Sequence, residues 1–167
     1  MQRVTIVGLL GAGKTTLAFA LGNATGLEVV QTDKIFLASD GAVMSPKDQR
    51  ARLTQILDKP AYILEGAHGW TFGPRLARCD TVIWVDIGFV RRALNAFRRR
   101  RAAFREHRMT SAKRPISAAR FWGWFLFGHV EERKALLTAI ADRTAGDRLV
   151  RLRSFAEVQT FLDSLQK

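Results

Sequence analysis

The 167-residue chain contains a single cysteine, Cys79, and no apolar run long enough to span a bilayer. A lone cysteine excludes an internal disulfide and is typical of a reducing compartment. The longest strongly apolar stretch late in the chain, FWGWFLF over residues 121–127, is far too short for a transmembrane helix. Together these absences favour a cytoplasmic protein without a membrane segment.

Acidic residues are also scarce, and the imbalance is local. The chain carries 27 lysines and arginines against 15 aspartates and glutamates, which gives a formal net charge of +12 at pH 7. Residues 91–108 contain one acid, Glu106, and the arginines Arg91, Arg92, Arg98, Arg99, Arg100, Arg101, Arg105 and Arg108. Such a segment attracts polyanions, and composition does not distinguish free nucleotides from nucleic acid.

Short apolar, β-branched runs alternate with helical patterns along the chain. The runs are residues 3–7, 27–31, 61–64, 81–85 and 148–152. The helical patterns are 15–23, 46–57, 89–108, 131–142 and 155–165, the last with Ser154 as its N-cap. Strands of this length separated by helices predict a single α/β domain with a parallel sheet covered on both faces.

Acidic residues end three of these predicted strands. Asp33, Glu65 and Asp86 follow the second, third and fourth runs. In an open parallel sheet, ligands bind beyond the carboxyl ends of the strands. The three side chains are therefore predicted to lie on the functional edge of the sheet, where Asp86 is equally compatible with a structural role and a place near Mg²⁺.

The first predicted strand runs into GLLGAGKTTL, which contains the G-x4-G-K-[ST] pattern of a phosphate-binding loop. Its glycines let the backbone curl around a phosphate, and the following helix adds the positive end of its dipole. Lys14 is expected to reach the β- and γ-phosphates, and the Thr15 hydroxyl is placed for Mg²⁺. The predicted nucleoside-triphosphate site consists of Gly8, Gly11, Ala12, Gly13, Lys14, Thr15 and Thr16.

Several classes of phosphate-loop protein are excluded by motifs that the chain lacks. No guanine-reading N/T-K-x-D pattern occurs and no D-x-x-G switch follows the second strand, which argues against a small GTPase. The LSGGQ signature of transporter ATPases is missing, and the chain is too short for a motor or a hexameric unfolding ATPase. A secretory leader is also not expected, because Lys14-Thr15-Thr16 follow the apolar start in place of a small-residue cleavage site.

The layout that remains resembles the nucleoside-monophosphate-kinase group of phosphate-loop kinases. Within that group the chain is most similar to the adenylate-kinase-related family of DNA topology modulation (FlaR-like) proteins. The resemblance rests on VTIVGLLGAGKTTLA, VVQTDKIF, YILEGAH, RLARCDTVIWVD, the arginine-rich segment and FWGWFLF. It implies a three-layer α/β/α fold with a five-stranded parallel sheet of order 2-3-1-4-5, a helical arginine-rich lid over residues 88–130, and Mg²⁺-dependent transfer of the γ-phosphoryl group of ATP.

The resemblance also assigns roles to single residues. Asp33 matches the acid that orients Mg²⁺-bound water or binds an acceptor hydroxyl, so Thr15 and Asp33 are the expected metal ligands. Glu65-Gly66 matches the acid-glycine pair after strand three, and Arg75 matches an arginine before strand four, both on the substrate side. Arg99, thirteen residues after Asp86, matches a lid arginine that contacts phosphate. Lys14, Asp33 and Arg99 are the expected catalytic residues.

The sequence departs from this pattern on the acceptor side. Related chains have Asp in place of Glu65 and Asn-Tyr in place of Ala67-His68, and Asn95 stands where a first lid arginine is expected. Trp70 follows strand three, where it can stack on an acceptor or simply pack, and a packing role is expected for His68. These departures leave the phosphoryl acceptor open: a nucleotide, a nucleoside or another small molecule.

Two functions are consistent with these patterns. The first is a kinase that binds ATP, Mg²⁺ and a small acceptor. The second is an ATP-dependent nucleic-acid-binding regulator, in which the segment from Arg91 to Arg108 grips a phosphate backbone. No nucleic-acid-binding module is visible in the sequence. Trp122, Trp124, Phe125 and Phe127 fit the core of a helical subdomain better than a platform for bases.

Overall fold

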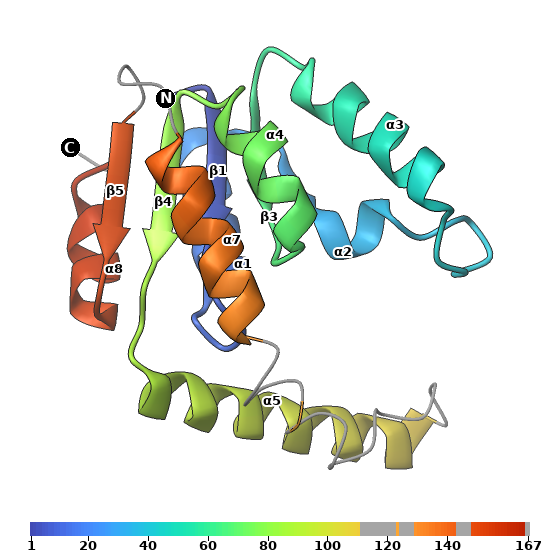
Figure 1. The fold of residues 1–167 in the computed structure, drawn as a ribbon. Helices are drawn as coiled ribbons and strands as arrows, with labels where there is room; N and C mark the ends of the chain where they lie inside the picture. Colours follow the sequence, from blue (N-terminus) through green and yellow to red (C-terminus); the bar gives the residue numbers. More distant parts are fainter. Residues whose placement is uncertain (111–122, 124–128, 143–147, 166–167) are drawn as a thin grey trace.

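The computed structural model describes residues 1–110, 123, 129–142 and 148–165. Its strands are β1 (Arg3–Val7), β2 (Val29–Gln31), β3 (Tyr62–Glu65), β4 (Thr81–Val85) and β5 (Arg148–Leu152). They form one parallel sheet of order β2-β3-β1-β4-β5 (Figure 1). The predicted fold class and strand order are confirmed.

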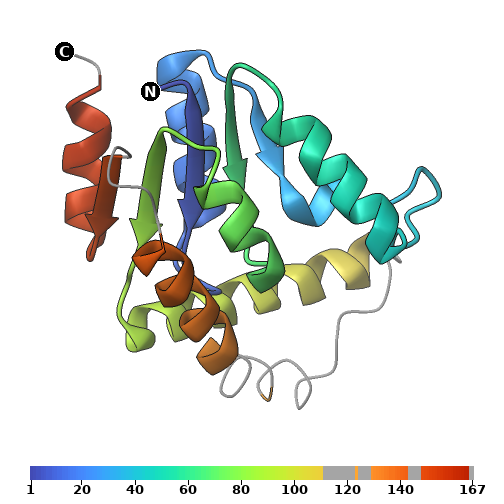
Figure 2. The ribbon, with the colours of Figure 1, turned by 45° about the horizontal axis from the view of Figure 1, so that its top comes forward.

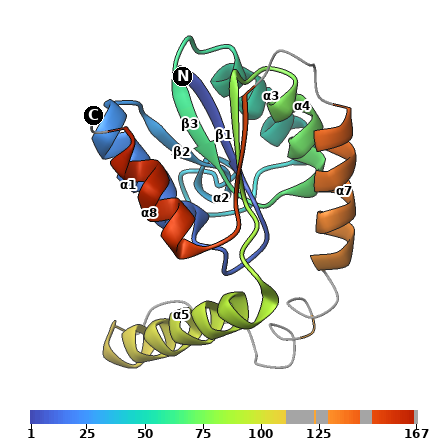
Figure 3. The same cartoon turned by 90° about the vertical axis from the view of Figure 1, so that its left-hand side faces the viewer.

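Helices cover both faces of this sheet (Figure 3). One face carries α1 (Lys14–Thr25) and α8 (Phe155–Asp163), and the other carries α3 (Pro46–Leu57), α4 (Phe72–Leu76) and α7 (His129–Ala141). The Ser154 hydroxyl accepts a hydrogen bond from the Glu157 N–H, which confirms the predicted N-cap of α8. None of the described helices is long and apolar enough to cross a membrane.

Alternate residues of the central strands build the core on each face. In β1, Val4 and Ile6 pack with the helices of the α1 side, whereas Val7 packs with the α4 and α7 side. In β4, Ile83 and Trp84 divide in the same way. This period of two is what a pleated strand imposes on its side chains, and it explains why the short apolar runs identified the strands so well.

The basic segment forms one 22-residue helix, α5 (Phe89–Thr110), which runs across the carboxyl ends of the strands (Figures 1 and 2). Three short elements at the same edge were not predicted: α2 (Thr32–Ile35), the 3-10 turn η1 (Gly69–Thr71) and α4. Each is too short to show a helical period in the sequence. The aromatic residues Trp122, Trp124, Phe125 and Phe127 and the end of the predicted lid lie outside the described residues.

A buried arginine of α4 ties two strands together at this edge. Arg75 is fully buried, and its Nη2 donates to the carbonyls of Ile6 (3.0 Å) and Leu64 (2.8 Å). Its Nη1 donates to the Gly66 carbonyl (3.0 Å). Burial lowers the pKa of Arg75 to about 10, so the guanidinium remains charged at neutral pH. The chain directions on leaving β1 and β3 are therefore fixed by one side chain.

We expect Arg75→Met to lower the free energy of unfolding by about 3 kcal/mol or more, because it strands three buried carbonyl oxygens without donors. Urea unfolding followed by circular dichroism measures this loss. Arg78→Met is the control, since Arg78 is half exposed and forms a surface ion pair with Asp58 (2.9 Å); its loss should cost below about 1 kcal/mol. Equal losses in the two variants would contradict the role given to Arg75.

Candidate active site

The phosphate-binding loop curls between β1 and α1 through glycines that no other residue could replace. Gly8, Gly11 and Gly13 have φ angles of 147°, 79° and 91°. A Cβ on Gly8 would lie 2.4 Å from the Val85 carbonyl oxygen, and a Cβ on Gly11 would lie 2.4 Å from the Arg92 carbonyl oxygen. Gly8 and Gly11 are thus required both by their positive φ angles and by the close approach of β4 and α5, and Gly13 by its positive φ angle.

Lys14 is buried at the end of this loop. Its Nζ donates to the Leu9 carbonyl (3.2 Å), and none of the described acidic side chains forms an ion pair with it. Burial lowers the pKa of Lys14 to about 8, since the ammonium is taken out of water. A buried cation on a curled loop is suited to an anionic ligand, which would pair with it directly.

The hydroxyl and carboxylates near Lys14 suit a magnesium ion held with phosphate. Thr15 Oγ1 donates to Glu65 Oε1 (3.1 Å), which also accepts from Gln31 Nε2 (2.9 Å). In the part of the chain that the structure describes, no group of three or more His, Cys, Asp or Glu could hold a metal by itself. Mg²⁺ commonly takes only one or two protein oxygens and completes its shell with phosphate and water.

The first turns of α5 are fastened to the phosphate-binding loop. Arg92 Nε donates to the Leu10 carbonyl (3.1 Å), and Asn95 Nδ2 donates to the Gly11 carbonyl (3.0 Å). Asn95, which takes the place of an expected lid arginine, therefore contacts the loop itself. These two hydrogen bonds fix the start of α5 against the loop, and they therefore determine where the later arginines of α5 lie relative to the loop.

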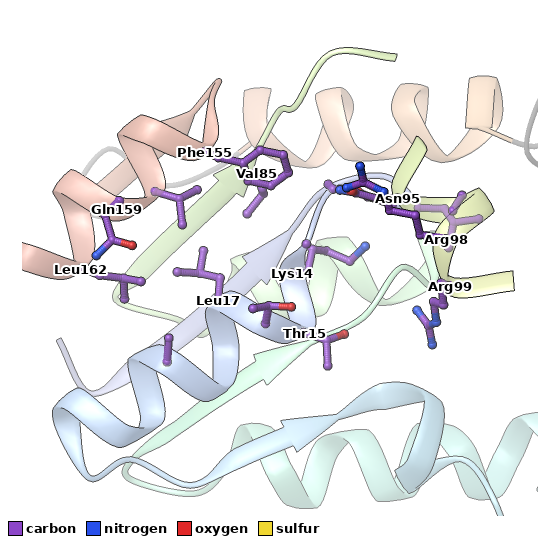
Figure 4. A pocket seen from close by; sticks show the side chains of 18 of the residues that line it. Lys14, Thr15, Leu17, Val85, Asn95, Arg98, Arg99, Phe155, Gln159 and Leu162 are labelled. Atoms are coloured by element: carbon purple, nitrogen blue, oxygen red, sulfur yellow. The ribbon is translucent and has the colours of Figure 1, made fainter. Parts of the chain in front are cut away.

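A cavity of about 1180 Å³ lies beside the loop, between α1, α5 and α8. In Figure 4, Lys14 lies between Phe155 on one side and Arg98 and Arg99 on the other. The α8 side is apolar, with Val85, Phe155 and Leu162 in its wall, and the α5 side is cationic. The Arg91 guanidinium carbon is 6.0 Å from the centroid of the Phe155 ring, so α5 and α8 meet across one end of the cavity. We refer to this space as the donor cavity.

A second cavity of about 420 Å³, the acceptor cavity, adjoins the first. Its wall includes Glu65, His68, Trp70 and Glu132, none of which lines the donor cavity. The residues shared by both cavities are Leu10, Lys14, Thr15, Asp33 and Arg99. The predicted catalytic residues Lys14, Asp33 and Arg99 are thus brought together where the two cavities meet.

The wall of the acceptor cavity is built on Phe36, a buried residue that follows α2. The Phe36 ring stacks on Trp70 with centroids 5.4 Å apart and meets His68 edge-on at 5.2 Å. His68 Nε2 in turn lies 3.0 Å from Asp33 Oδ1. The hydrogen bond from His68 lowers the pKa of Asp33, so this carboxylate is ionised at neutral pH. His68 packs as expected, and it also orients Asp33.

Other predicted site residues lie elsewhere. Arg75 lines neither cavity and is engaged with backbone carbonyls, and Gly8 is covered by β4. Asp86 pairs with Arg133 and Arg151. Glu132 was missed because it belongs to α7, which carries no motif and whose first turn meets the site only through the fold.

No protein-family model matches the sequence, and no curated protein matches it. Solved structures match nearly the whole chain. Shikimate kinase from Acinetobacter baumannii in complex with shikimate has a TM-score of 0.58 and 16% identity, over 99% of this chain and 92% of that one. Shikimate kinase from Aquifex aeolicus has a TM-score of 0.53 and 17% identity, over 98% and 96%. Deoxyadenosine kinase from M. mycoides with bound dATP has a TM-score of 0.53 and 10% identity, over 100% of both chains.

These similarities show that the chain has the fold of the phosphate-loop kinases. The similarity is at the level of fold, because the identities are 10–17%. The narrower resemblance to adenylate-kinase-related and DNA topology modulation proteins stays a prediction.

We expect Lys14→Met to raise the free energy of unfolding at pH 7, by up to about 3 kcal/mol, because it removes a buried charge whose pKa is lowered from 10.5 to about 8. Below pH 8 the ammonium is charged in both states and its burial destabilises the folded state. Between about pH 8 and 10.5 the folded state releases its proton first, so the advantage of the variant shrinks as pH rises. Urea unfolding at several pH values measures this.

The control is Lys34→Met, since Lys34 is exposed on α2. Its free energy of unfolding should stay within about 0.5 kcal/mol of the original at each pH. A Lys14→Met variant that is less stable than the original protein at pH 7 would contradict the assigned burial penalty.

Proposed function

We propose that this chain is a phosphotransferase that moves the γ-phosphoryl group of ATP to a hydroxyl group of a small acceptor, with Mg²⁺. The observation that carries the proposal is the meeting of two cavities at Lys14 and Arg99. Phosphoryl transfer needs a donor and an acceptor in line, with cations at the point of transfer. Two adjoining cavities with shared cations satisfy this need.

In this proposal the donor cavity takes ATP. The triphosphate lies along the phosphate-binding loop, and the base lies toward Phe155, where the wall is apolar and aromatic. The match to a deoxyadenosine kinase with bound dATP supports an adenine nucleotide as a ligand of this fold. Thr15 and the Glu65 carboxylate would hold Mg²⁺ with the phosphates, and the ion would neutralise part of their charge.

The reaction itself asks little covalent chemistry of the protein. The acceptor O–H bond breaks, a new bond forms between that oxygen and the γ-phosphorus, and the bond from the γ-phosphorus to the leaving oxygen of ADP breaks. Asp33, ionised and oriented by His68, accepts the hydroxyl proton and later returns it to solvent. Lys14 and Arg99 balance the charge on the transferring group.

The basic helix supports this function over the nucleic-acid-binding alternative. Arg98, Arg99 and Arg100 all contribute to the wall of the donor cavity. Arginines in the wall of a cavity beside the loop suit a bound nucleotide. We therefore treat stimulation of ATP turnover by DNA as an outcome that would overturn the proposal.

The first experiment measures ADP release and product phosphorylation with a panel of nucleosides, nucleoside monophosphates, sugars, amino sugars and shikimate. One class of acceptor should stimulate ADP release and become phosphorylated, and Lys14→Met should lower that rate by about 100-fold or more. Because Lys14→Met is expected to be at least as stable as the original protein, lost activity would not reflect unfolding. Stimulation by duplex DNA with no phosphorylated small product would overturn the kinase proposal.

Arg99→Met should lower kcat by about 100-fold, because Arg99 is shared by both cavities and faces the point of transfer. Arg101→Met is the matched control on the same helix. The Arg101 guanidinium carbon lies 5.9 Å from the Phe97 ring centroid, and Arg101 lines neither cavity. Steady-state kinetics should show kcat for the control within about twofold of the original, and equal losses in both variants would assign the effect to net charge.

A further inference from the structure

The acceptor cavity differs in charge from the donor cavity. The donor cavity has Arg98, Arg99 and Arg100 in its wall, whereas the acceptor cavity has the carboxylates of Asp33, Glu65 and Glu132. Among the described residues of the acceptor wall, the cationic side chains are Lys14 and Arg99, and both are shared with the donor cavity. Asp33 and Glu65 belong to the point of transfer, so Glu132 is the carboxylate that the rest of the acceptor cavity presents among the described residues.

Glu132 has no hydrogen-bond partner in this wall among the residues that the structure describes. It lies in the first turn of α7, and its carboxylate makes no hydrogen bond or ion pair with any described residue. Partial burial raises its pKa. By contrast, Glu65 is bonded to Thr15 and Gln31, and Asp33 faces His68. Asp33 and Glu65 each have one carboxylate oxygen engaged, whereas both oxygens of Glu132 are open to hydrogen bonds from a ligand as far as the described residues show.

Two other arginines of this region do not line the acceptor cavity. Arg75 is bound to three carbonyl oxygens. Arg50 lies 6.0 Å from the Trp70 ring centroid but is not part of the cavity wall. A carboxylate or phosphate on the part of the acceptor that lies between Trp70 and Glu132 would face the Glu132 carboxylate, and like charges in close contact are strongly unfavourable.

The acceptor cavity also has an aromatic part in its wall, formed by His68 and Trp70. Trp70 is 42% exposed, and its ring stacks on the buried ring of Phe36. A supported indole offers a flat apolar surface at little cost in conformational entropy. Such a surface favours an acceptor with a ring over an open-chain alcohol.

We infer that the acceptor is a ring-bearing alcohol without negative charge, held between the Trp70 ring and the Glu132 carboxylate. A nucleoside and an amino sugar both have this chemistry, and both present O–H or N–H donors to a carboxylate. The inference rests on the proposed kinase function and narrows it: monophosphates and carboxylic acids are excluded as acceptors.

The experiment compares ring-bearing acceptors of different charge. The sets are a nucleoside with its 3′-monophosphate, which keeps the 5′-hydroxyl free, and glucosamine with glucose and glucuronic acid, each with ATP and Mg²⁺. We expect kcat/KM for the uncharged or cationic member to exceed that of the anionic member by at least about 100-fold. Phosphorylation of the nucleoside alone, or of the amino sugar alone, identifies which source the cavity takes.

Glu132→Gln tests the residue that carries the inference. It preserves the shape of the side chain and removes its charge, so it should raise KM for the preferred acceptor by about tenfold while KM for ATP stays within about twofold. Glu131→Gln is the matched control, since Glu131 is exposed on the same turn and lines neither cavity. Trp70→Leu should raise the same KM by a similar factor, and Trp70→Phe should restore most of it.

The outcomes separate the two proposals. Preferred phosphorylation of an anionic acceptor would overturn this inference and leave the kinase function standing, and so would a Glu132→Gln variant with unchanged KM for its acceptor. If no member of any charge class is phosphorylated while DNA or water alone consumes the γ-phosphate, the kinase function falls, and the inference falls with it.

Discussion

The edge of the sheet that carries the site depends on the hydrogen bonds of one buried guanidinium. Strand ends release carbonyl groups from the ladder, and in a buried setting each must find a donor. Arg75 supplies donors to β1, to β3 and to the turn that follows β3. The phosphate-binding loop leaves from the first of these strands, and the wall with His68 and Trp70 leaves from the second. The two halves of the site are therefore both held by Arg75. Burial of the charged guanidinium lowers the stability of the folded protein.

Lys14 is a second buried charge near the site, but its burial is connected with ligand binding rather than with holding the strands. An ammonium group taken out of water destabilises the folded protein, and its lowered pKa expresses that penalty. The penalty is useful where an anionic ligand binds, because the ligand relieves it. A functional site commonly gives up stability in this way. The buried charge of Lys14 thus lowers the stability of the folded chain and at the same time favours the binding of phosphate.

The sequence alone predicted the fold well, because the decisive signals were local. The bounds of β1, β4, β5 and α3 agree with the predicted segments. A short apolar strand and a capped helix can each be recognised from a few consecutive residues. The meeting of Lys14, Asp33 and Arg99 also followed from strand ends and motif spacing. What escaped prediction depends on packing between distant segments. Arg75 was expected at the substrate because of its position in a pattern, and only the burial of α4 shows what its guanidinium binds.

Glu132 and the support of Trp70 could not be predicted for the same reason. Glu132 is one acid among others on an ordinary helix, and its place in the cavity follows from how α7 packs against α4 and η1. Trp70 owes its rigidity to Phe36, which lies more than thirty residues earlier in the chain. Recognition of the acceptor is therefore distributed over segments with no common motif, whereas recognition of phosphate is concentrated in one.

The bond from Arg92 to the Leu10 carbonyl has a geometric consequence for the loop. A trans peptide unit is planar, and its N–H points opposite to its C=O. Because Arg92 holds the Leu10 oxygen on the α5 side, the Gly11 N–H of the same unit is turned away from α5. A side chain 82 positions along the sequence thus fixes the direction of a backbone dipole that it does not touch. The shape of the anion-binding loop therefore depends on its own glycines and also on α5, the helix that follows β4.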